Sequence, residues 1–492
     1  MKHITSSTVA DLFDVAGTRR LEQRAAADLP AHALMQRAGL AVARLAMAIA
    51  PRARTIWIAC GPGNNGGDGL EAAFQLQTRG HTPVVTHIGE EARLPADALA
   101  SLRRARDAGV RFAAQPPAQC DLAIDALLGI GATRPPEGLM RDWLQRMHAQ
   151  APIVLSLDLP SGLNADTGTL AFDFLGSAIQ PRPHTRRVCL TLLTLKPGLF
   201  TAQGRDAVGE LWFDDLGVES RGEPPAARLP GPPIDQTRLH ASHKGRYGDV
   251  AVIGGAPGMA GAALLAASAA LAAGAGRVYL SALDPGFAAL DPLHPELMLR
   301  RSDTLDLATM AVVCGCGGGT AIRARLPRVL RDAHSLVLDA DALNAVAESA
   351  ELQALLRARA ERGQASILTP HPLEAARLLG STTTAVQGDR LGAARRLAEQ
   401  LDAAVVLKGS GTVITDAAQP PIINPSGNGR LATAGTGDVL AGMIGAALAS
   451  GRSTIAAASE AVWRHGNLAD RWPAEIPLTA GALARGLPHS LG

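Results

Sequence analysis

The first segment that could do chemistry is a loop rich in glycine and asparagine. Residues 61–69 read G-P-G-N-N-G-G-D-G, and they follow an apolar run and precede a helical pattern. Glycines permit a close backbone approach, and the N–H groups at the start of a helix attract phosphate groups. The segment has neither the G-x-G-x-x-G dinucleotide fingerprint nor a P-loop lysine. We therefore predict an anion-binding loop of another kind; a structural turn is the alternative, but it would not require tandem asparagines.

Two acidic residues follow other apolar runs of the first half. Asp125 opens the sequence D-A-L-L-G-I-G, and Asp158 opens D-L-P-S-G. In doubly wound sheets ligands bind beyond the carboxyl ends of the strands, so both acids should meet the glycine loop in one crevice. Asn, Asp and Ser oxygens there can bind a hard cation, and a carboxylate can move a proton. Either acid alone would more often cap a loop, but their joint placement favours a site.

The second half contains a different pair of glycine motifs. Residues 408–412 read K-G-S-G-T after an apolar run, and residues 435–438 read G-T-G-D at the start of an apolar helix. Backbone donors at such a helix start suit a phosphoryl group, and Asp438 would there deprotonate a substrate hydroxyl. The alternative is a buried helix with Asp438 as its N-terminal acid. His371, between two prolines at a strand end, is a further candidate contact, although a lone histidine is more often structural.

These motifs interrupt short apolar runs that alternate with helical patterns. Residues 55–60, 122–125 and 153–158 in the first half, and 250–253 and 311–314 in the second, are predicted as buried strands. Continuously apolar strands that alternate with helices indicate parallel sheets covered on both faces. We therefore predict an α/β fold with two three-layer αβα domains.

A proline-rich stretch without apolar periodicity separates the two halves. We predict a first domain over residues 1–220, a linker over 221–235 and a second domain over 236–492. Residues 260–276 are an uncharged run, but their alanine and glycine content predicts a buried helix and not a membrane span.

The composition excludes several kinds of partner. The 492 residues include 47 Lys+Arg and 45 Asp+Glu, a net charge of +2, which argues against nucleic-acid or anionic-membrane binding. The five cysteines are scattered and the N-terminus has no apolar signal segment, so we expect a cytoplasmic protein. Lysine is scarce among the basic residues, which are otherwise arginine. It occurs at Lys2, Lys196, Lys244 and Lys408.

The first half resembles the NAD(P)H-hydrate epimerase family over about residues 10–218. The resemblance rests on A-L-M-Q-R-A-G at residues 33–39, the glycine loop, D-A-L-L-G-I-G and D-L-P-S-G-L-N-A-D-T-G, in that order. It implies a Rossmann-like domain that interconverts the R and S epimers of hydrated NADH and NADPH (NADHX and NADPHX) with a bound potassium ion. The basic segment at residues 182–187 departs from the pattern.

The family's residues can be carried over to matching positions. Potassium would be held by Asn65, Asp125 and Ser161, and Asp158 would be catalytic. The implied substrate contacts are Asn64, Asn65, Gly66, Gly67, Asp68, Gly129, Ile130, Gly131, Ala132, Thr133, Arg134, Pro135 and Asp158.

The second half resembles the ribokinase-like fold, and more closely the ADP-dependent NAD(P)H-hydrate dehydratases, over about residues 236–488. The matches include H-K-G-R-Y-G, G-M-A-G-A, T-P-H-P-L-E, K-G-S-G-T and G-T-G-D. The hydrate would contact Ala262, Gly317, His371 and Asp438, and ADP would contact Lys408, Gly409, Ser410, Gly411, Thr412 and Gly437. Residues 314–319 read C-G-C-G-G-G where the family has G-P-G-L-G, which weakens the Gly317 assignment, and T-A-G replaces T-G-G at 433–435.

Together the two resemblances imply a bifunctional enzyme that repairs nicotinamide cofactors. Asp438 would take the proton of the C6 hydroxyl as it attacks the terminal phosphate of ADP, with Mg²⁺ present, and loss of phosphate would restore NAD(P)H and give AMP. The implied partners are these small molecules, and we expect a homo-oligomer. The alternative is a small-molecule kinase joined to a non-catalytic binding module. The paired domains and the retained Asn65, Asp125, Asp158 and Ser161 argue against it.

Overall fold

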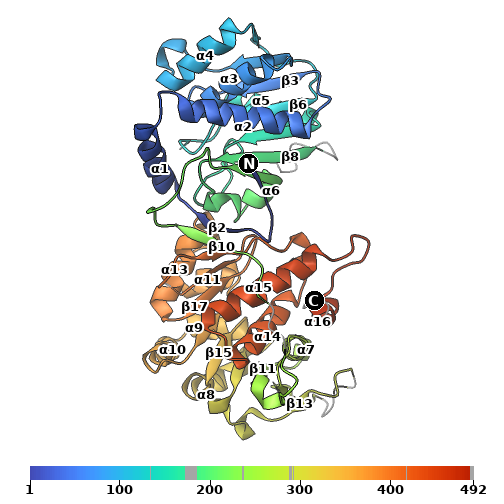
Figure 1. Cartoon of the computed structure of the whole chain (residues 1–492). Helices are drawn as coiled ribbons and strands as arrows, with labels where there is room; N and C mark the ends of the chain where they lie inside the picture. The colour runs from blue at the N-terminus through green and yellow to red at the C-terminus, as the bar shows by residue number, and fades with distance from the viewer. Residues whose placement is uncertain are drawn as a thin grey trace. The chain divides into compact units, whose positions relative to one another are not determined.

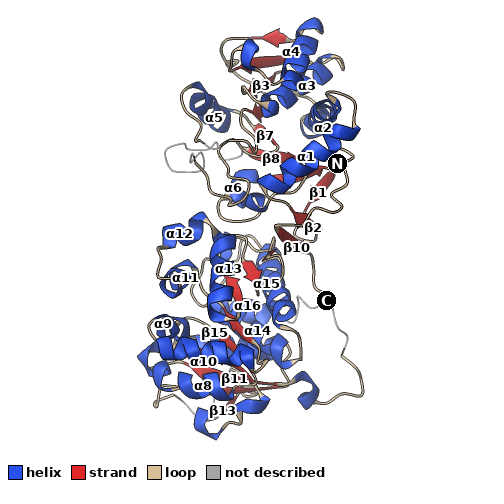
Figure 2. Cartoon of the chain, turned by 90° about the vertical axis from the view of Figure 1, so that its left-hand side faces the viewer, coloured by secondary structure: helices blue, strands red, loops and turns tan. Residues whose placement is uncertain are grey.

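The chain folds into two compact α/β units, which we describe from a computed structural model. The structure describes residues 1–132, 134–171, 185–234, 238–287, 291, 293–416 and 418–487. The first unit contains Met1–Thr5 and Ala10–Ala227, and the second contains Ser6–Val9 and Arg228–Gly492. In each unit the strands lie inside and helices cover them (Figures 1 and 2).

The sheet of the first unit is parallel except at one edge, where β1 runs antiparallel to β9. Among the described residues its strand order is β1 (Lys2–Ile4), β9 (Glu210–Asp214), β8 (Arg186–Leu192), β7 (Ile153–Leu157), β6 (Leu122–Ala126), β3 (Ile56–Cys60), β4 (Pro83–His87) and β5 (Arg111–Phe112). The helices are α1 (Val15–Asp28), α2 (Ala33–Ile49), α3 (Asn64–Gln77), α4 (Ala96–Asp107), α5 (Leu139–Gln150) and α6 (Gly204–Val208).

Alternate side chains of β3 enter two different cores. Ile56 and Ile58 pack with buried residues of α2 and α3, whereas Trp57 packs with Trp143 and Met147 of α5. Because successive side chains of a strand point to opposite faces, the sheet is covered on both sides. The predicted three-layer α/β arrangement is therefore confirmed for this unit.

The sheet of the second unit is longer, and its central strands are parallel. Among the described residues its order is β13 (Met298–Leu299), β12 (Arg277–Ala282), β11 (Asp249–Gly254), β14 (Ala311–Cys314), β15 (Ser335–Leu338), β16 (Ser366–Leu368), β17 (Ala404–Leu407), β18 (Val413–Thr415), β19 (Ile422–Ile423), β10 (Ala227–Pro230) and β2 (Val9–Leu12). Its helices are α7 (Ala260–Ala272), α8 (Leu326–Asp332), α9 (Asp341–Ala347), α10 (Ala350–Glu361), α11 (Pro372–Leu378), α12 (Thr383–Gly388), α13 (Arg390–Leu401), α14 (Thr436–Ala449), α15 (Thr454–Asp470) and α16 (Ala480–Gly486).

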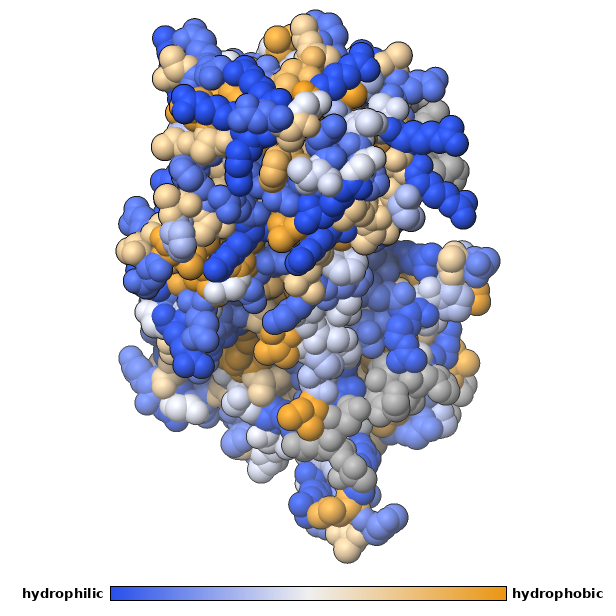
Figure 3. All heavy atoms as spheres, turned by 45° about the horizontal axis from the view of Figure 1, so that its top comes forward, coloured by the Kyte–Doolittle hydropathy of each residue, from blue (hydrophilic) through white to orange (hydrophobic). Residues whose placement is uncertain are grey.

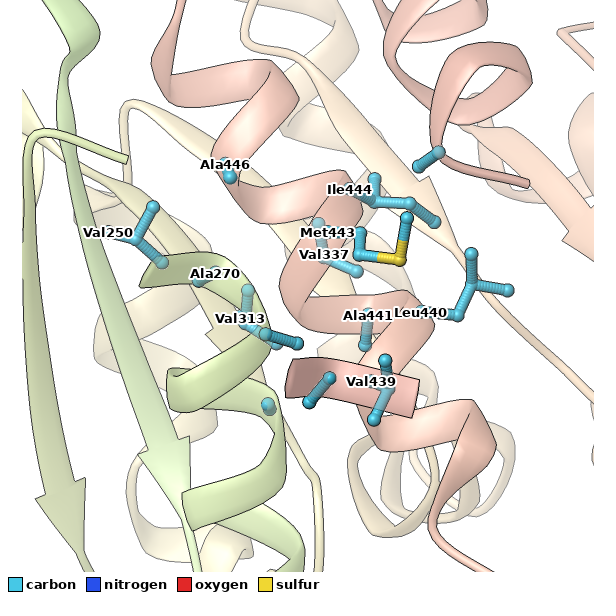
Figure 4. Close-up of a cluster of buried hydrophobic side chains, with 14 of the residues drawn as sticks. Val250, Ala270, Val313, Val337, Val439, Leu440, Ala441, Met443, Ile444 and Ala446 are labelled. Carbon is cyan, nitrogen blue, oxygen red and sulfur yellow. The ribbon is translucent and has the colours of Figure 1, made fainter. Parts of the chain in front are cut away.

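The same alternation divides the second unit into layers. Val250 and Val313 pack against Val439 of α14 and Ala270 of α7, and Figure 4 draws this core. The neighbouring positions on these strands, such as Ile253, enter a second core with residues of α8, α9 and α13. The predicted α/β class is thus confirmed here as well.

The uncharged run at residues 260–276 forms the helix α7, whose buried alanines pack in the core, as predicted. Within the part of the chain that the structure describes, no helix combines the length and apolarity needed to cross a membrane. On the face drawn in Figure 3, apolar side chains are interspersed with hydrophilic ones.

The predicted linker contains a strand, which the sequence interpretation did not anticipate. Within residues 221–235, β10 pairs with β19 through Arg228 and Ile422, and Ala227 and Leu229 are buried while Arg228 is exposed. The two-residue alternation was obscured by the surrounding prolines, which an edge region of a sheet tolerates. The short segment Ser6–Val9 belongs to the second compact unit.

Candidate active sites

The first site lies at the carboxyl ends of the neighbouring parallel strands β3, β6 and β7. The chain leaves β3 into the glycine loop, and α3 begins at Asn64, several residues earlier than the glycine content had suggested. Glycine is required inside this first turn for close packing. A Cβ atom at Gly66 would lie 1.9 Å from the Gly61 carbonyl oxygen, and one at Gly67 would lie 2.6 Å from Cε of Met35. The turn therefore keeps the asparagines and Asp68 at the end of the sheet.

Asp125 and Ser161 form one buried network. The Ser161 hydroxyl donates to Asp125 Oδ1 at 2.6 Å, and the Ser161 amide donates to Oδ2 at 2.9 Å. The Leu128 amide donates to Ser161 Oγ at 2.9 Å. Burial raises the pKa of Asp125, although the hydrogen bonds from Ser161 and Leu127 oppose this. Such a buried carboxyl gains most from a cation bound beside it.

Asn65 supplies the observation that points to a cation. Both atoms of its side-chain amide are buried without a hydrogen-bond partner in the described structure. The side chain lies against Gly129, where a Cβ atom would approach Asn65 Oδ1 to 3.4 Å. The unsatisfied Asn65 amide oxygen, the buried Asp125 carboxylate and the Ser161 hydroxyl are all hard oxygen donors. These three residues therefore fit the potassium ion that the resemblance implies.

Asp158 follows β7 in a left-handed backbone conformation, with φ of 62°. Its Oδ1 atom accepts a short hydrogen bond from the ammonium group of Lys196, and the Leu192 amide also donates to it at 3.3 Å. Lys196 is fully buried and also donates to the Leu192 carbonyl at 2.7 Å. The sequence interpretation did not place Lys196 in the site, although the scarcity of lysine was a signal for it.

Several of the described residues in the segment that follows β6 are exposed. The Ala132 amide donates to the Gly129 carbonyl at 3.0 Å, which closes a turn. Gly131, Ala132, Arg134 and Pro135 are exposed and Ile130 is half-buried. Thr133 and residues 182–184 of the basic segment lie outside the described residues.

The second site is built around the start of α14. Gly435 is the residue before this helix, and its φ is 88°. A Cβ atom there would lie 2.7 Å from Leu265 Cδ1, so both conformation and space require glycine. The Thr436 hydroxyl donates to the Leu431 carbonyl at 2.8 Å, and His465 Nε2 bonds the Thr436 carbonyl at 2.9 Å. These contacts fix the helix start that presents Asp438.

A half-buried lysine lies in the second site, but it contacts an acid other than the proposed catalytic one. Lys408 Nζ donates to Asp339 Oδ1 at 2.7 Å, and the Thr369 hydroxyl donates to the same oxygen at 2.7 Å. Burial lowers the pKa of Lys408, but Asp339 and Glu374 outweigh this, so its pKa is raised. Asp339 directly follows β15 and was not among the predicted site residues.

Asp438 lies near the Lys408–Asp339 pair but forms no ion pair with a lysine in the described structure. Burial, and then the Asp339 charge, raise the pKa of Asp438 to about 6. The ligand atoms of Cys316, Asp339 and Asp438 lie within 4.8 Å of one another. Burial holds the pKa of the Cys316 thiol well above its usual range, so it faces Asp438 as a neutral S–H group. At neutral pH Asp438 is mostly ionised and can accept a proton.

His371 caps the N-terminus of α11. Its Nδ1 atom accepts the Leu373 amide at 3.1 Å, while Glu374 Oε2 accepts the His371 amide at 2.8 Å. Its Nε2 atom lies 3.2 Å from Glu374 Oε1. Because Nδ1 is an acceptor, the ring proton is on Nε2, and this N–H group faces Glu374 Oε1. Burial raises the pKa of Glu374 to about 7.

Ala262 and Gly317 are neighbours, as a shared role would require. Gly317 has a φ of 57°, and a Cβ atom there would lie 2.9 Å from Ala262 Cβ and 2.6 Å from the Met259 carbonyl oxygen. The Ala256 amide donates to the Gly317 carbonyl at 2.7 Å. The C-G-C-G-G-G sequence thus retains a tight loop at this position.

The K-G-S-G-T loop rests on a buried arginine. Arg390 Nη2 donates to the carbonyls of Leu407 and Lys408 at 3.1 and 3.2 Å, and a Cβ atom at Gly409 would lie 3.0 Å from Nη1. A Cβ atom at Gly437 would lie 3.3 Å from Lys408 Nζ, so the loop meets the start of α14. In this loop Ser410 is exposed, Gly411 is buried with φ of 61°, and the Thr412 hydroxyl donates to the Gly409 carbonyl at 3.1 Å.

Comparison with known proteins assigns both halves. Residues 31–198 match the family described as YjeF-related protein N-terminus, and residues 250–487 match NAD(P)H-hydrate dehydratase. The bifunctional NAD(P)H-hydrate repair enzyme Nnr of Escherichia coli is 35% identical over 96% of this chain and 92% of its own length. The chain belongs to the family of bifunctional NAD(P)H-hydrate repair enzymes.

Some known proteins resemble only the second half of the chain. The ADP-dependent (S)-NAD(P)H-hydrate dehydratase of Neisseria meningitidis is 41% identical over 55% of this chain and 92% of its own. The crystal structure of an ADP/ATP-dependent NAD(P)H-hydrate dehydratase from Bacillus subtilis, co-crystallized with ATP/Mg²⁺, is 30% identical and covers 52% of this chain and 93% of its own, with a TM-score of 0.45.

Proposed function

We propose that the chain repairs hydrated nicotinamide cofactors in two steps, with the epimerase domain over residues 1–220 and the dehydratase domain over residues 236–492. The observation that carries this proposal is that each unit presents its own acid at the carboxyl edge of its own parallel sheet, Asp158 in one and Asp438 in the other. The first unit interconverts R and S NADHX or NADPHX. The second converts the S epimer and ADP into NAD(P)H, AMP and phosphate.

In the epimerase site, Asn65, Asp125 and Ser161 would hold the potassium ion, which would supply positive charge to the site when bound. The first turn of α3, from Asn64 through Gly66 and Gly67 to Asp68, provides helix N-terminal donors for the substrate's anionic groups. Gly129 to Pro135, of which Gly131, Ala132, Arg134 and Pro135 are exposed, are proposed to contact the substrate as well. Asp158, oriented by Lys196, accepts a proton from the oxygen that moves at C6.

In the dehydratase site, Asp438 removes the proton of the C6 hydroxyl, whose oxygen attacks the terminal phosphorus of ADP. Lys408, Gly409, Ser410, Gly411, Thr412 and Gly437 bind the nucleotide, and Ala262, Gly317 and His371 bind the hydrate. The carboxylate oxygens near Asp438 suit the Mg²⁺ that accompanies ADP. Phosphate leaves far more readily than hydroxide, so elimination restores the double bond.

One assay tests both activities. The purified chain is incubated with mixed NADHX epimers, with and without ADP, and NADH absorbance is followed. We expect full recovery only with ADP. No ADP-dependent recovery would contradict the dehydratase, and recovery of only the S fraction, with slow spontaneous epimerisation, would contradict the epimerase. A stable phosphorylated product without NADH would indicate a kinase instead.

We place this activity in the cytoplasm and expect a homo-oligomer.

A further inference from the structure

A cysteine lies among the acids of the second site. Cys316 is fully buried, and its Sγ atom lies 3.9 Å from Asp339 Oδ2. One ligand atom from each of Cys316, Asp339 and Asp438 lies within 4.8 Å of the other two. The family pattern G-P-G-L-G has no cysteine, so the thiol is a feature of the C-G-C-G-G-G loop of this chain. The proposed dehydration makes no use of the sulfur atom.

The hydrogen bonds of Asp339 leave one of its oxygens facing the thiol. The Lys408 ammonium and the Thr369 hydroxyl both donate to Oδ1, each at 2.7 Å, whereas Oδ2 faces Cys316. Cys316 and Asp339 are buried and Asp438 is half-buried, so an ion would reach the three ligand atoms from the side of Asp438. A sulfur atom and two carboxylate oxygens from three separate segments therefore surround one accessible point.

This ligand set suits a thiophilic divalent cation such as Zn²⁺. Around tetrahedral zinc, sulfur and oxygen ligands lie roughly 3.5 Å apart, close to the 3.9 Å between Cys316 and Asp339. The separations to Asp438, at most 4.8 Å, close by an adjustment of its half-buried side chain. The charged groups that act on the thiol are Asp438, Asp339 and Lys408. A thiolate and two carboxylates carry three negative charges, which a divalent cation and the Lys408 ammonium balance.

We propose that Cys316, Asp339 and Asp438 form an inhibitory site for a thiophilic divalent cation. As the ion binds, the thiol proton passes to solvent and a sulfur–metal bond forms, without electron transfer. Three protein ligands leave a fourth position for water. Because the ion occupies a carboxylate oxygen of Asp438, this residue no longer accepts the hydroxyl proton. The binding is independent of the proposed function, whereas the inhibition rests on it.

Cobalt reports the site directly. Co²⁺ takes the tetrahedral ligands that Zn²⁺ takes, and a cobalt–thiolate bond gives a charge-transfer band in the near ultraviolet. In the purified full chain, kept reduced with a phosphine, we expect stoichiometric Co²⁺ to produce this band and Zn²⁺ to remove it. Excess Mg²⁺, which prefers oxygen ligands, should leave the band in place.

Variants of the two neighbouring cysteines assign the band. Cys316→Ala should abolish it, and Cys316→Ser, which keeps a polar group of similar size, should abolish it as well. Cys314→Ala is the matched control, because Cys314 lies two residues away but belongs to the other core of the unit. This control should keep the band.

The consequence is measured as ADP-dependent NADH formation from the S epimer, with Zn²⁺ varied at fixed Mg²⁺. Without Zn²⁺, Cys316→Ala should match the wild-type rate, which verifies that it is folded. Its half-inhibiting Zn²⁺ concentration should be at least about tenfold higher than that of the wild type. No band in the wild type, a band that Mg²⁺ removes or that persists in Cys316→Ala, or equal zinc sensitivity would overturn the proposal. A chain with the Cys316-dependent band that forms no NADH would instead refute the dehydratase function and leave the metal site in place.

Discussion

In the first unit the buried Lys196 contacts Asp158 itself, whereas in the second unit the half-buried Lys408 contacts Asp339 and forms no ion pair with Asp438 in the described structure. Each lysine follows a strand at the carboxyl edge of its sheet, in a chain whose other basic residues are almost all arginine. The compact ammonium of lysine suits a narrow buried space better than the wider guanidinium group.

The two acids therefore have different surroundings. In the proposed epimerase site, the Asp158 carboxyl has the ammonium group of Lys196 as its direct partner. In the proposed dehydratase step, the hydroxyl is converted into a phosphate ester, which leaves readily, so a single base is sufficient. Burial and the Asp339 charge raise the pKa of that base, Asp438, to about 6, while the Lys408 charge opposes the shift.

The largest expected effect comes from removing the base of the second site. Asp438→Asn keeps the shape of the side chain but cannot accept the hydroxyl proton, so ADP-dependent NADH formation should fall at least about 1,000-fold. Epimer interconversion should be unchanged, since it belongs to the other unit. Loss of both activities in a folded protein would contradict two independent sites.

Breaking the lysine contact in the first site should have the next largest effect. Lys196→Met leaves Asp158 without its counter-ion among buried groups, so we expect epimer interconversion to fall about 100-fold and unfolding of the first unit to become easier by about 3 kcal/mol. Parallel activity and thermal-unfolding measurements check this. Lys2→Met, which removes an exposed lysine of the same unit, should change neither.

The two sites should also respond differently to pH. Asp438 must be ionised to act, and its pKa is about 6, so dehydration at saturating substrate should rise with pH and reach its plateau above about pH 7. At pH 5 the rate should be roughly a tenth of the plateau. Epimer interconversion should not follow this profile, because it does not depend on Asp438. Parallel slopes for the two activities would break the comparison.

A smaller effect is expected at the support of the nucleotide loop. Arg390→Lys removes the forked donor that holds the Leu407 and Lys408 carbonyls, so the loop should bind ADP less well. We expect KM for ADP to rise about tenfold with kcat nearly constant. Arg396→Lys, on the exposed side of the same helix, is the control. A fall in kcat at unchanged KM would place Arg390 in another role.

Much of the fold followed from the sequence because its signals are local. Apolar runs such as residues 250–253 and 311–314 became strands within a residue of the predicted bounds, and their alternation with helices gave the α/β class. The strand β10 was overlooked because four residues between prolines carry too short a pattern. The early start of α3 was also missed, because close packing around Gly66 and Gly67 outweighs the low helix propensity of glycine.

The sequence by itself determined which residues stand at the strand ends, because motifs such as G-P-G-N-N-G-G-D-G and G-T-G-D are contiguous. Only the tertiary structure decided which charges meet. Lys196 is 38 residues from Asp158, and Lys408 is 69 residues from Asp339. The protonation behaviour of Asp438 depends on these contacts and on burial, which arise only when distant strands assemble into one sheet.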